Sequence, residues 1–141
     1  MTTHHDATVA RNEGVVRAFL KGWDDQDIDA CMAQVTDDMV YLNHPHEKIK
    51  GKKNVAKMIG SIFKPAKKVE FILLNVIGQG NKIVTERLDQ WDWDGTGLNC
   101  KLPVCGIFEL TEDGKIYEWR EYYDNGVWLE QGGPSLVPDN D

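Results

Sequence analysis

The chain has 141 residues with a hydrophobic content of 41%, and it carries a formal net charge of −7 at pH 7. A chain of this length forms one domain with a sizeable core, and its acidic balance argues against a nucleic-acid partner. The longest apolar run, Phe71 to Ile77, is far shorter than the about 20 residues of a membrane span. Residues 1–6 contain neither the basic region nor the apolar stretch of a signal peptide, so we expect a cytoplasmic protein with no membrane partner.

The sequence shows no internal repeat and no linker, so we expect residues 1–141 to form a single domain. Residues 1–7 and 127–141 are expected to be peripheral or flexible, since the C-terminal tail contains Gly132-Gly133-Pro134 and polar residues. The cysteines lack the CxxC spacing of metal or redox motifs. We expect free, buried thiols at Cys31, Cys100 and Cys105.

The first half of the chain has helical patterning. Apolar residues recur near the helical period from Thr8 to Gln26, and a second, shorter helix is predicted from Ile28 to Val35. A short strand follows from Met39 to Leu42. The apolar spacing then predicts a third helix from Lys52 to Phe63.

Two polar clusters in this half contain residue types that bind metals. The acidic run 24–29 lacks the glycine and the terminal glutamate of a calcium loop, so capping and solvation explain it. His44 and His46 have the spacing of metal ligands, but no third ligand is identifiable in the sequence. We therefore expect loop histidines here, and neither a metal nor another cofactor.

The second half of the chain has strand patterning. Runs rich in β-branched residues, separated by turns that contain glycine, predict strands over Val69–Ile77, Lys82–Trp93, Leu98–Leu110 and Ile116–Asp124. Helices followed by a run of antiparallel strands are typical of an α+β fold. A strongly curved sheet with helices packed on its concave face would enclose a cone-shaped pocket.

Alternation along the predicted strands places charged and aromatic residues on the same faces. Arg87 and Asp89 share one face of their strand, and this face continues to Trp91 and Trp93, which indicates an enclosed side. In the last strand, one face carries the following residues: Tyr117, Trp119, Glu121 and Tyr123. A carboxylate between aromatic residues indicates a pocket or an interface.

These residues favour acid–base chemistry. Neither serine lies in a GxSxG elbow and no phosphate-binding loop is present, so proton transfer by carboxylates is the remaining option. Asp89 and Glu121 form a candidate acid–base pair, and Arg87 beside them could hold both by hydrogen bonds. Tyr41 and Asn43 add uncharged groups that can hold a water molecule. The same set of residues is also compatible with a structural ion network.

The chain resembles the limonene-1,2-epoxide hydrolase family, within the SnoaL-like, nuclear-transport-factor-like superfamily. The resemblance covers most of the chain, from about Val15 to Asp124, and the short motifs occur in the expected order and spacing. The matching pieces are Tyr41-Leu42-Asn43, Thr85-Glu86-Arg87-Leu88-Asp89, Gly106-Ile107-Phe108-Glu109-Leu110-Thr111, Gly114-Lys115-Ile116 and Trp119-Arg120-Glu121-Tyr122-Tyr123-Asp124.

This resemblance implies a homodimeric, cofactor-independent epoxide hydrolase that converts a small apolar epoxide to a diol in one step, with no covalent intermediate. Asp89 would protonate the epoxide oxygen, Arg87 would bridge the two carboxylates, and Tyr41 and Asn43 would hold the water. The family base is an aspartate, and here that position is Glu121. The expected pocket walls are Trp91, Trp119, Tyr123, Leu20, Trp23, Ile62 and Val104.

The glutamate at position 121 keeps alternative functions open. Its additional methylene moves the carboxylate by roughly an ångström, a displacement that can cost about a hundredfold in rate. Another acid–base enzyme on this fold, such as a ketosteroid-isomerase-like or polyketide-cyclase-like protein, is one alternative. A non-catalytic module that binds a hydrophobic ligand is the other. The combination of Arg87 and Asp89 with Tyr41 and Asn43 favours the hydrolase.

Overall fold

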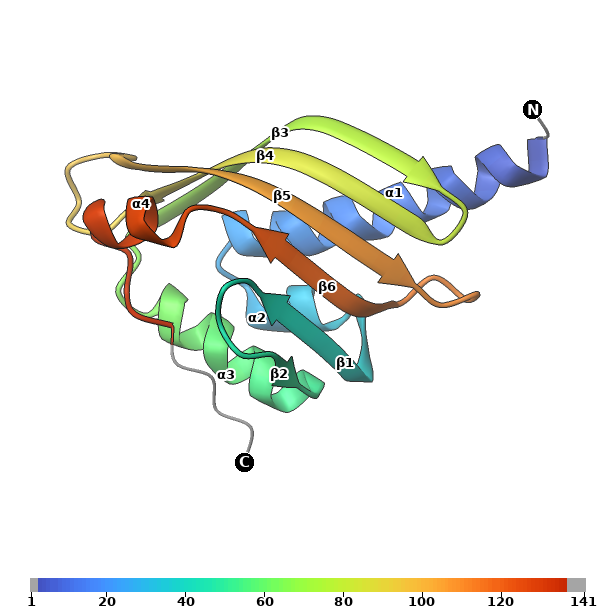
Figure 1. The fold of residues 1–141 in the computed structure, drawn as a ribbon, viewed down its shortest axis with the longest axis horizontal. Coiled ribbons are helices and arrows are strands. Elements are labelled where there is room, and N and C mark those ends of the chain that lie inside the picture. Colours follow the sequence, from blue (N-terminus) through green and yellow to red (C-terminus); the bar gives the residue numbers. More distant parts are fainter. Residues whose placement is uncertain (1–2, 137–141) are drawn as a thin grey trace.

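The computed structural model describes residues 3–136, which form a curved sheet with helices packed on its concave side (Figure 1). The helices are α1 (Thr3–Asp24), α2 (Ile28–Met32), α3 (Lys52–Phe63) and α4 (Asn125–Glu130). The strands are β1 (Val35–Asn43), β2 (Ile49–Lys50), β3 (Lys68–Gln79), β4 (Lys82–Asp92), β5 (Cys100–Leu110) and β6 (Ile116–Tyr122). The predicted α+β fold is confirmed.

The sheet has the strand order β2-β1-β6-β5-β4-β3. The strands from β3 to β6 form an antiparallel meander, as the sequence predicted, and β1 joins β6 in parallel. This parallel pairing aligns Tyr41 with Trp119, and Asn43 with Glu121. The early strand and the last strand of the sheet are therefore neighbours, which brings their polar residues to one place.

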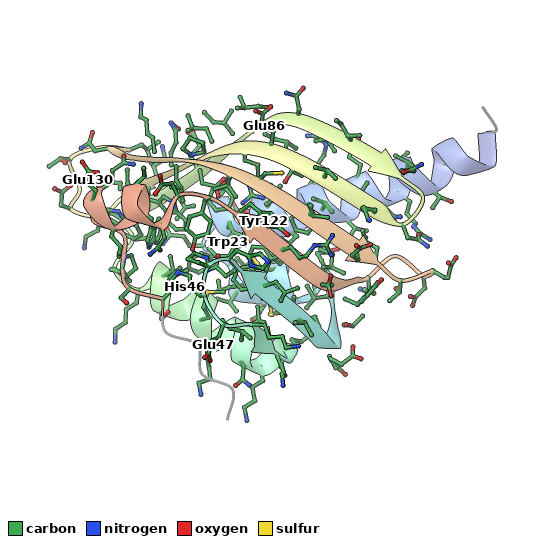
Figure 2. The ribbon with its side chains drawn as sticks, viewed as in Figure 1. Trp23, His46, Glu47, Glu86, Tyr122 and Glu130 are labelled. Carbon is green, nitrogen blue, oxygen red and sulfur yellow. The ribbon has the colours of Figure 1, made fainter. Side chains whose placement is uncertain are left out.

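The core lies between the concave face of the sheet and the helices. Helix α1 buries an apolar stripe of Val16, Phe19, Leu20 and Trp23, as its periodicity predicted. Helix α3 buries Val55, Met58, Ile59, Ile62 and Phe63 on its inner side. Trp23 lies between sheet and helices, whereas Glu86 projects from the outer side of the sheet (Figure 2). Within residues 3–136, no helix is long and apolar enough to cross a membrane.

The boundary between α2 and β1 differs from the sequence prediction. Helix α2 ends at Met32 rather than Val35, and β1 begins at Val35 rather than Met39. Val35 pairs with Ile116 of β6, and the Ile116 N–H donates to the Gln34 carbonyl at 2.9 Å. Tertiary pairing with β6 therefore overrides the local helical pattern here.

A β-bulge changes the face on which Tyr117 lies. Glu109 pairs with Glu118, but the next residue of β5, Leu110, pairs with Ile116, so Tyr117 is the extra residue of β6. Tyr117 is 42% exposed, while Trp119 is buried. The prediction that Tyr117 shares the inner face with Trp119 and Glu121 is therefore wrong.

Part of the C-terminal tail is packed into the protein. Residues 127–136 were predicted to be peripheral, yet Trp128 of α4 is 3% exposed and its indole N–H donates to the Pro134 carbonyl at 2.7 Å. Its ring also packs edge-on against Trp91, with the centroids 5.3 Å apart. At the other end, α1 begins at Thr3 rather than Thr8. The predictions for residues 1–2 and 137–141 lie outside the described residues.

The two polar clusters of the first half make local contacts. Asp27 caps α2 by accepting the Ala30 N–H at 3.0 Å, as expected for the acidic run. His44 stacks on Tyr122, and His46 Nε2 lies 3.1 Å from Asn125 Oδ1. No group of three metal-binding side chains occurs in the described part of the chain.

The cysteines do not all follow the prediction. Cys31 and Cys100 are buried and free, as predicted, whereas Cys105 is free but exposed. The prediction of a buried thiol at Cys105 is therefore wrong. The reason lies in the alternation of β5, since Cys105 lies on the outer face, between the inward-facing Val104 and Gly106.

Candidate active site

The site is built around the guanidinium of Arg87, which is 1% exposed. Arg87 Nε donates to Asp89 Oδ1 at 3.0 Å, and Nη2 donates to Asp89 Oδ2 at 2.9 Å. On the other side, Nη2 donates to Glu121 Oε1 at 2.6 Å and Nη1 to Glu121 Oε2 at 3.1 Å. Arg87 and Asp89 come from β4 and Glu121 from β6, so the cation joins two strands across β5.

Burial makes it costly for both carboxylates to be ionised together. Asp89 and Glu121 are both buried, and this desolvation raises the pKa of each carboxyl group, against the lowering effect of the Arg87 charge. The negative charge of Asp89 raises the pKa of Glu121 further. With both ionised, the cluster would carry one net negative charge, and a single shared proton makes it neutral. The arrangement can therefore offer one proton donor and one proton acceptor.

Polar groups from β1 and the end of β6 complete the site. The Tyr41 ring stacks on Trp119 with centroids 3.8 Å apart. Burial raises the pKa of Tyr41 well above its usual value and that of Tyr123 to about 12, so both hydroxyls are protonated at neutral pH. Asn43 Oδ1 and the Tyr123 hydroxyl are buried, and among the described residues neither makes a hydrogen bond of good geometry, although the two side chains interact with each other. Such incompletely satisfied buried groups fit a bound water or substrate oxygen.

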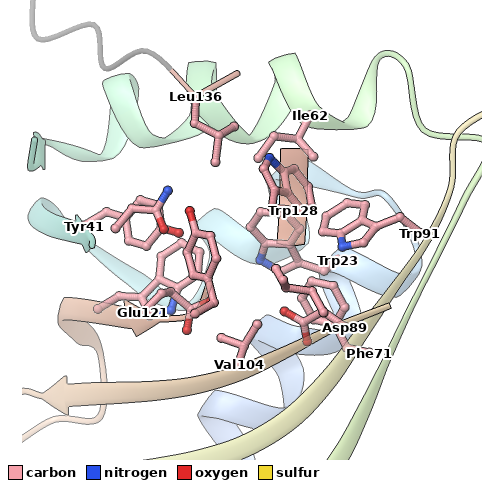
Figure 3. Close-up of a pocket in the computed structure, with 14 residues that line it drawn as sticks. Trp23, Tyr41, Ile62, Phe71, Asp89, Trp91, Val104, Glu121, Trp128 and Leu136 are labelled. Carbon is pink, nitrogen blue, oxygen red and sulfur yellow. The ribbon is translucent and has the colours of Figure 1, made fainter. Parts of the chain in front are cut away.

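These groups lie at one side of a pocket with about 370 Å³ of empty space, part of it open to solvent (Figure 3). All five predicted catalytic residues are brought together, with Asp89, Glu121, Tyr41 and Asn43 in the lining and Arg87 behind the two carboxylates. The pocket walls contain six of the seven predicted wall residues: Trp91, Trp119, Tyr123, Trp23, Ile62 and Val104.

Leu20 does not line this pocket, so that prediction is wrong. Leu20 instead lines a separate hollow beside α1 with Phe71 and Leu73 of β3. The apolar stripe of α1 is wide, and helical periodicity alone does not distinguish the side that faces the pocket from the side that faces β3.

The pocket has four further wall residues, and sequence reasoning missed them: Phe71, Leu102, Trp128 and Leu136. Phe71 of β3 and Leu102 of β5 are the two cross-strand neighbours of Asp89. A prediction of the strand register would therefore have placed both beside Asp89. Trp128 and Leu136 follow the sheet, where no periodic pattern places them. Figure 3 shows Leu136 and Ile62 on the side of the pocket opposite Asp89 and Glu121.

A curved, six-stranded sheet that encloses a pocket against its helices is the SnoaL-like, nuclear-transport-factor-like fold. Residues 10–131 match the model of the limonene-1,2-epoxide hydrolase catalytic domain. The chain therefore belongs to the limonene-1,2-epoxide hydrolase family, and the predicted resemblance and enzyme class are confirmed.

Individual relatives agree with this assignment. Epoxide hydrolase EphG of Mycobacterium tuberculosis is 33% identical over 111 residues, which cover 77% of this chain and 70% of EphG. The structure of an LEH-like epoxide hydrolase from M. tuberculosis superposes with a TM-score of 0.72 at 26% identity, covering 87% of this chain and 90% of that one. A protein described as a SnoaL-like polyketide cyclase from Jannaschia sp. CCS1 has a TM-score of 0.75 at 20% identity, over 90% and 96% of the two chains, and shows the fold alone.

Proposed function

We propose that this protein adds water to a small apolar epoxide, terpene-like or cyclic, and forms a vicinal diol in one step. The observation that carries the proposal is the bridging of two buried carboxylates by Arg87 at the wall of an aromatic pocket. Hydration of an epoxide needs a general acid that protonates the epoxide oxygen and a general base that takes a proton from the water. The two carboxyl groups can serve as this acid and this base.

The proposed reaction moves one proton at each end of the opening bond. A water held by Asn43 Oδ1 and Tyr41 gives a proton to Glu121, and its oxygen bonds to an epoxide carbon. The carbon–oxygen bond of the ring breaks, and Asp89 gives its proton to the departing oxygen. Glu121 then holds the proton and Asp89 the charge, so the total charge around Arg87 stays constant throughout the step. Return of the proton to Asp89 restores the site.

The walls favour a compact apolar substrate. Indole and phenyl rings surround the pocket, and the only charged residues in its described lining are Asp89 and Glu121. A monocyclic terpene epoxide fits this description, whereas a ligand with an anionic group would meet two carboxylates without a free cation.

Isotope labelling in a single turnover tests the proposal. With enzyme in excess over limonene 1,2-epoxide in ¹⁸O-labelled water, we expect every diol molecule to carry one labelled oxygen, because solvent water attacks directly. A covalent ester on Asp89 or Glu121 would instead deliver unlabelled carboxylate oxygen in the first turnover, which mass spectrometry of the diol distinguishes. Absence of diol from limonene 1,2-epoxide and from cyclohexene oxide would refute the proposed activity.

We also propose that the protein is a homodimer whose second copy covers the outer face of the sheet. This face carries a groove with about 610 Å³ of open space, and most of its lining is apolar. The lining residues are Leu74, Leu88, Pro103, Val104 and Cys105, together with Glu86 and Arg87. Leu74 and Ile72 of β3 and Tyr122 of β6 are exposed on the described surface. An exposed apolar sheet face of this kind is typical of a subunit interface.

A charge placed in this groove should separate the subunits. We expect light scattering to show a dimer for the wild-type protein at tens of micromolar, and a monomer for Leu74→Lys, because an ammonium group in each copy would have to lose its hydration at the interface. Leu129→Lys on α4 is the control, since Leu129 is equally apolar and exposed but lies outside the groove. A wild-type monomer at this concentration would contradict the proposal.

A further inference from the structure

Two residues outside the proposed acid–base set contact the buried cluster from behind. Thr85 is 0% exposed and lies on the same face of β4 as Arg87 and Asp89. Gly106 of β5 pairs with Thr85 on one side and with Glu121 on the other. Thr85 therefore lies on the strand that carries Asp89, and Gly106 lies on the strand between it and the strand that carries Glu121.

The hydrogen bonds of Thr85 have a fixed direction. Arg87 Nη1 donates to Thr85 Oγ1 at 3.1 Å, and a guanidinium cannot accept a hydrogen bond. The hydroxyl hydrogen of Thr85 is therefore free to donate to the Gly106 carbonyl, which lies at 3.2 Å. Arg87 has five N–H bonds, and Asp89 and Glu121 accept four of them. Thr85 accepts the fifth, which would otherwise be buried without a partner.

Gly106 provides the space that this geometry needs. A Cβ atom at this position would lie 2.4 Å from Arg87 Nη1 and 2.4 Å from Glu121 Oε2. It would also lie 3.0 Å from Thr85 Oγ1. Neither the guanidinium nor the carboxylate is free to move aside, because both are buried and hydrogen-bonded to each other. Any side chain at position 106 would therefore displace Arg87 or Glu121.

We propose that Thr85 and Gly106 form a seat for the Arg87 guanidinium and thereby position Glu121 for proton abstraction. Thr85 fixes Nη1 by its hydroxyl, and Gly106 leaves the gap through which Nη1 reaches the carboxylate of Glu121. Glu121 has one more rotatable bond than the aspartate expected at this position, so a fixed cation is needed to hold its carboxylate in one place. The two residues are positioning residues, and their role in turnover rests on the proposed hydration reaction.

The seat also influences the protonation of Glu121. The charged or titratable groups around Glu121 are Arg87 and Asp89 from β4, Tyr41 from β1, and Tyr123 after β6. Among these, Arg87 is the group that favours the ionised carboxylate. If Nη1 loses its contact with Thr85, its position opposite Oε2 is less fixed, the hydrogen bond to Glu121 weakens, and the pKa of Glu121 rises. Proton abstraction then requires a higher pH.

Replacing Thr85 by valine removes the hydroxyl and keeps the branched shape. We expect Thr85→Val to fold and to lower kcat on limonene 1,2-epoxide by about 10- to 100-fold, as for loss of a hydrogen bond to a charged group. The acid limb of the kcat/KM profile should move to higher pH. Thr85→Ser keeps the hydroxyl and should restore kcat to within about threefold of wild type.

The matched control is Thr36→Val, because Thr36 Oγ1 is buried without a partner among the described residues. It should leave both kcat and the acid limb unchanged. A folded Thr85→Val protein with wild-type kcat and an unmoved acid limb would overturn the inference. Loss of folding would overturn it as well, since it would show a structural role for the hydroxyl.

A titration that needs no substrate separates this inference from the proposed function. The ¹³C carboxyl resonance of Glu121 reports its pKa directly, and we expect it to titrate at higher pH in Thr85→Val than in the wild-type protein. If the wild-type protein turns over no epoxide, the proposed function fails, while this titration still decides the inference. An identical titration of Glu121 in both proteins would overturn the inference that Thr85 positions Arg87 against Glu121.

Gly106→Ala tests the other half of the seat. We expect at least about a hundredfold loss of kcat, because a displacement of this size misplaces the reacting groups. Gly14→Ala is the control, since a Cβ at Gly14 in α1 meets nothing within 4 Å. Wild-type turnover by a folded Gly106→Ala protein would contradict the role of Gly106.

Discussion

Glu121→Gln should lower kcat on a confirmed epoxide substrate by about 10²–10⁴-fold, the usual contribution of a general base. Glutamine has the size of glutamate but cannot take the proton of the attacking water. It also turns an amide N–H toward Arg87, which donates to both oxygens of the native carboxylate at 2.6 and 3.1 Å. Steady-state diol formation, with circular dichroism to confirm folding, measures the effect.

Asp124→Asn is the matched control for this substitution. Asp124 is exposed and accepts the Val127 N–H at the start of α4, and asparagine caps a helix as well as aspartate does. We therefore expect near wild-type turnover. A Glu121→Gln enzyme as active as the wild type would show that another group is the base.

Glu121→Asp asks whether the site needs the longer side chain. The carboxylate of Glu121 contacts Arg87 through both oxygens, so the longer arm is already accommodated in a bidentate pair. Shortening it by one methylene would draw the oxygens back from Nη1 and Nη2. A loss of turnover would indicate that this pocket is adapted to glutamate. Retained turnover would indicate that the carboxylate of either side chain, aspartate or glutamate, reaches the water.

Strand alternation made much of the site predictable from the sequence. Arg87 and Asp89 follow each other at alternate positions of one strand, so they had to share a face, and the aromatic residues beyond them indicated that this face is enclosed. The contact with Glu121 depends on the pairing of β4, β5 and β6 in chain order, which a meander with short turns provides. The roles of these residues remain proposals.

Other parts of the structure depend on contacts that alternation does not encode. The bulge at Tyr117 adds one residue to β6 and moves that side chain outward, while Trp119 and Glu121 keep their inward positions. Trp128 of α4 reaches the pocket through packing on Trp91 and a hydrogen bond to the Pro134 carbonyl, and Leu136 reaches it from the segment after α4. Such long-range contacts set side-chain positions without a local sequence signal.

Arg87→Met should destabilise the protein by about 3–5 kcal/mol at neutral pH, the typical cost of leaving buried charge without its partner. Methionine fills similar volume but leaves Asp89 and Glu121 uncompensated, because Arg87 is the cation that contacts both carboxylates. Urea denaturation, followed by tryptophan fluorescence, measures the free energy of unfolding. Arg17→Met is the control, and it should cost less than about 1 kcal/mol because Arg17 forms an exposed pair with Glu13 on α1.

The loss in Arg87→Met should depend on pH in a defined direction. Burial already raises the pKa of Asp89 and Glu121, and removal of the guanidinium takes away the group that lowers it, so both folded-state pKa values rise further. When folding raises the pKa of a carboxyl group, its contribution to the free energy of unfolding depends on pH. The contribution is most favourable below the unfolded pKa of about 4, and it is lost as the pH rises toward and through the folded-state pKa. The variant should therefore recover stability relative to the wild type as the pH falls from 8 toward 5. A stability difference that is the same at both pH values would contradict this prediction, because it would mean that the folded variant binds no more protons than the folded wild-type protein between pH 5 and 8. A ¹³C titration of both carboxyl groups in the variant measures this proton binding directly.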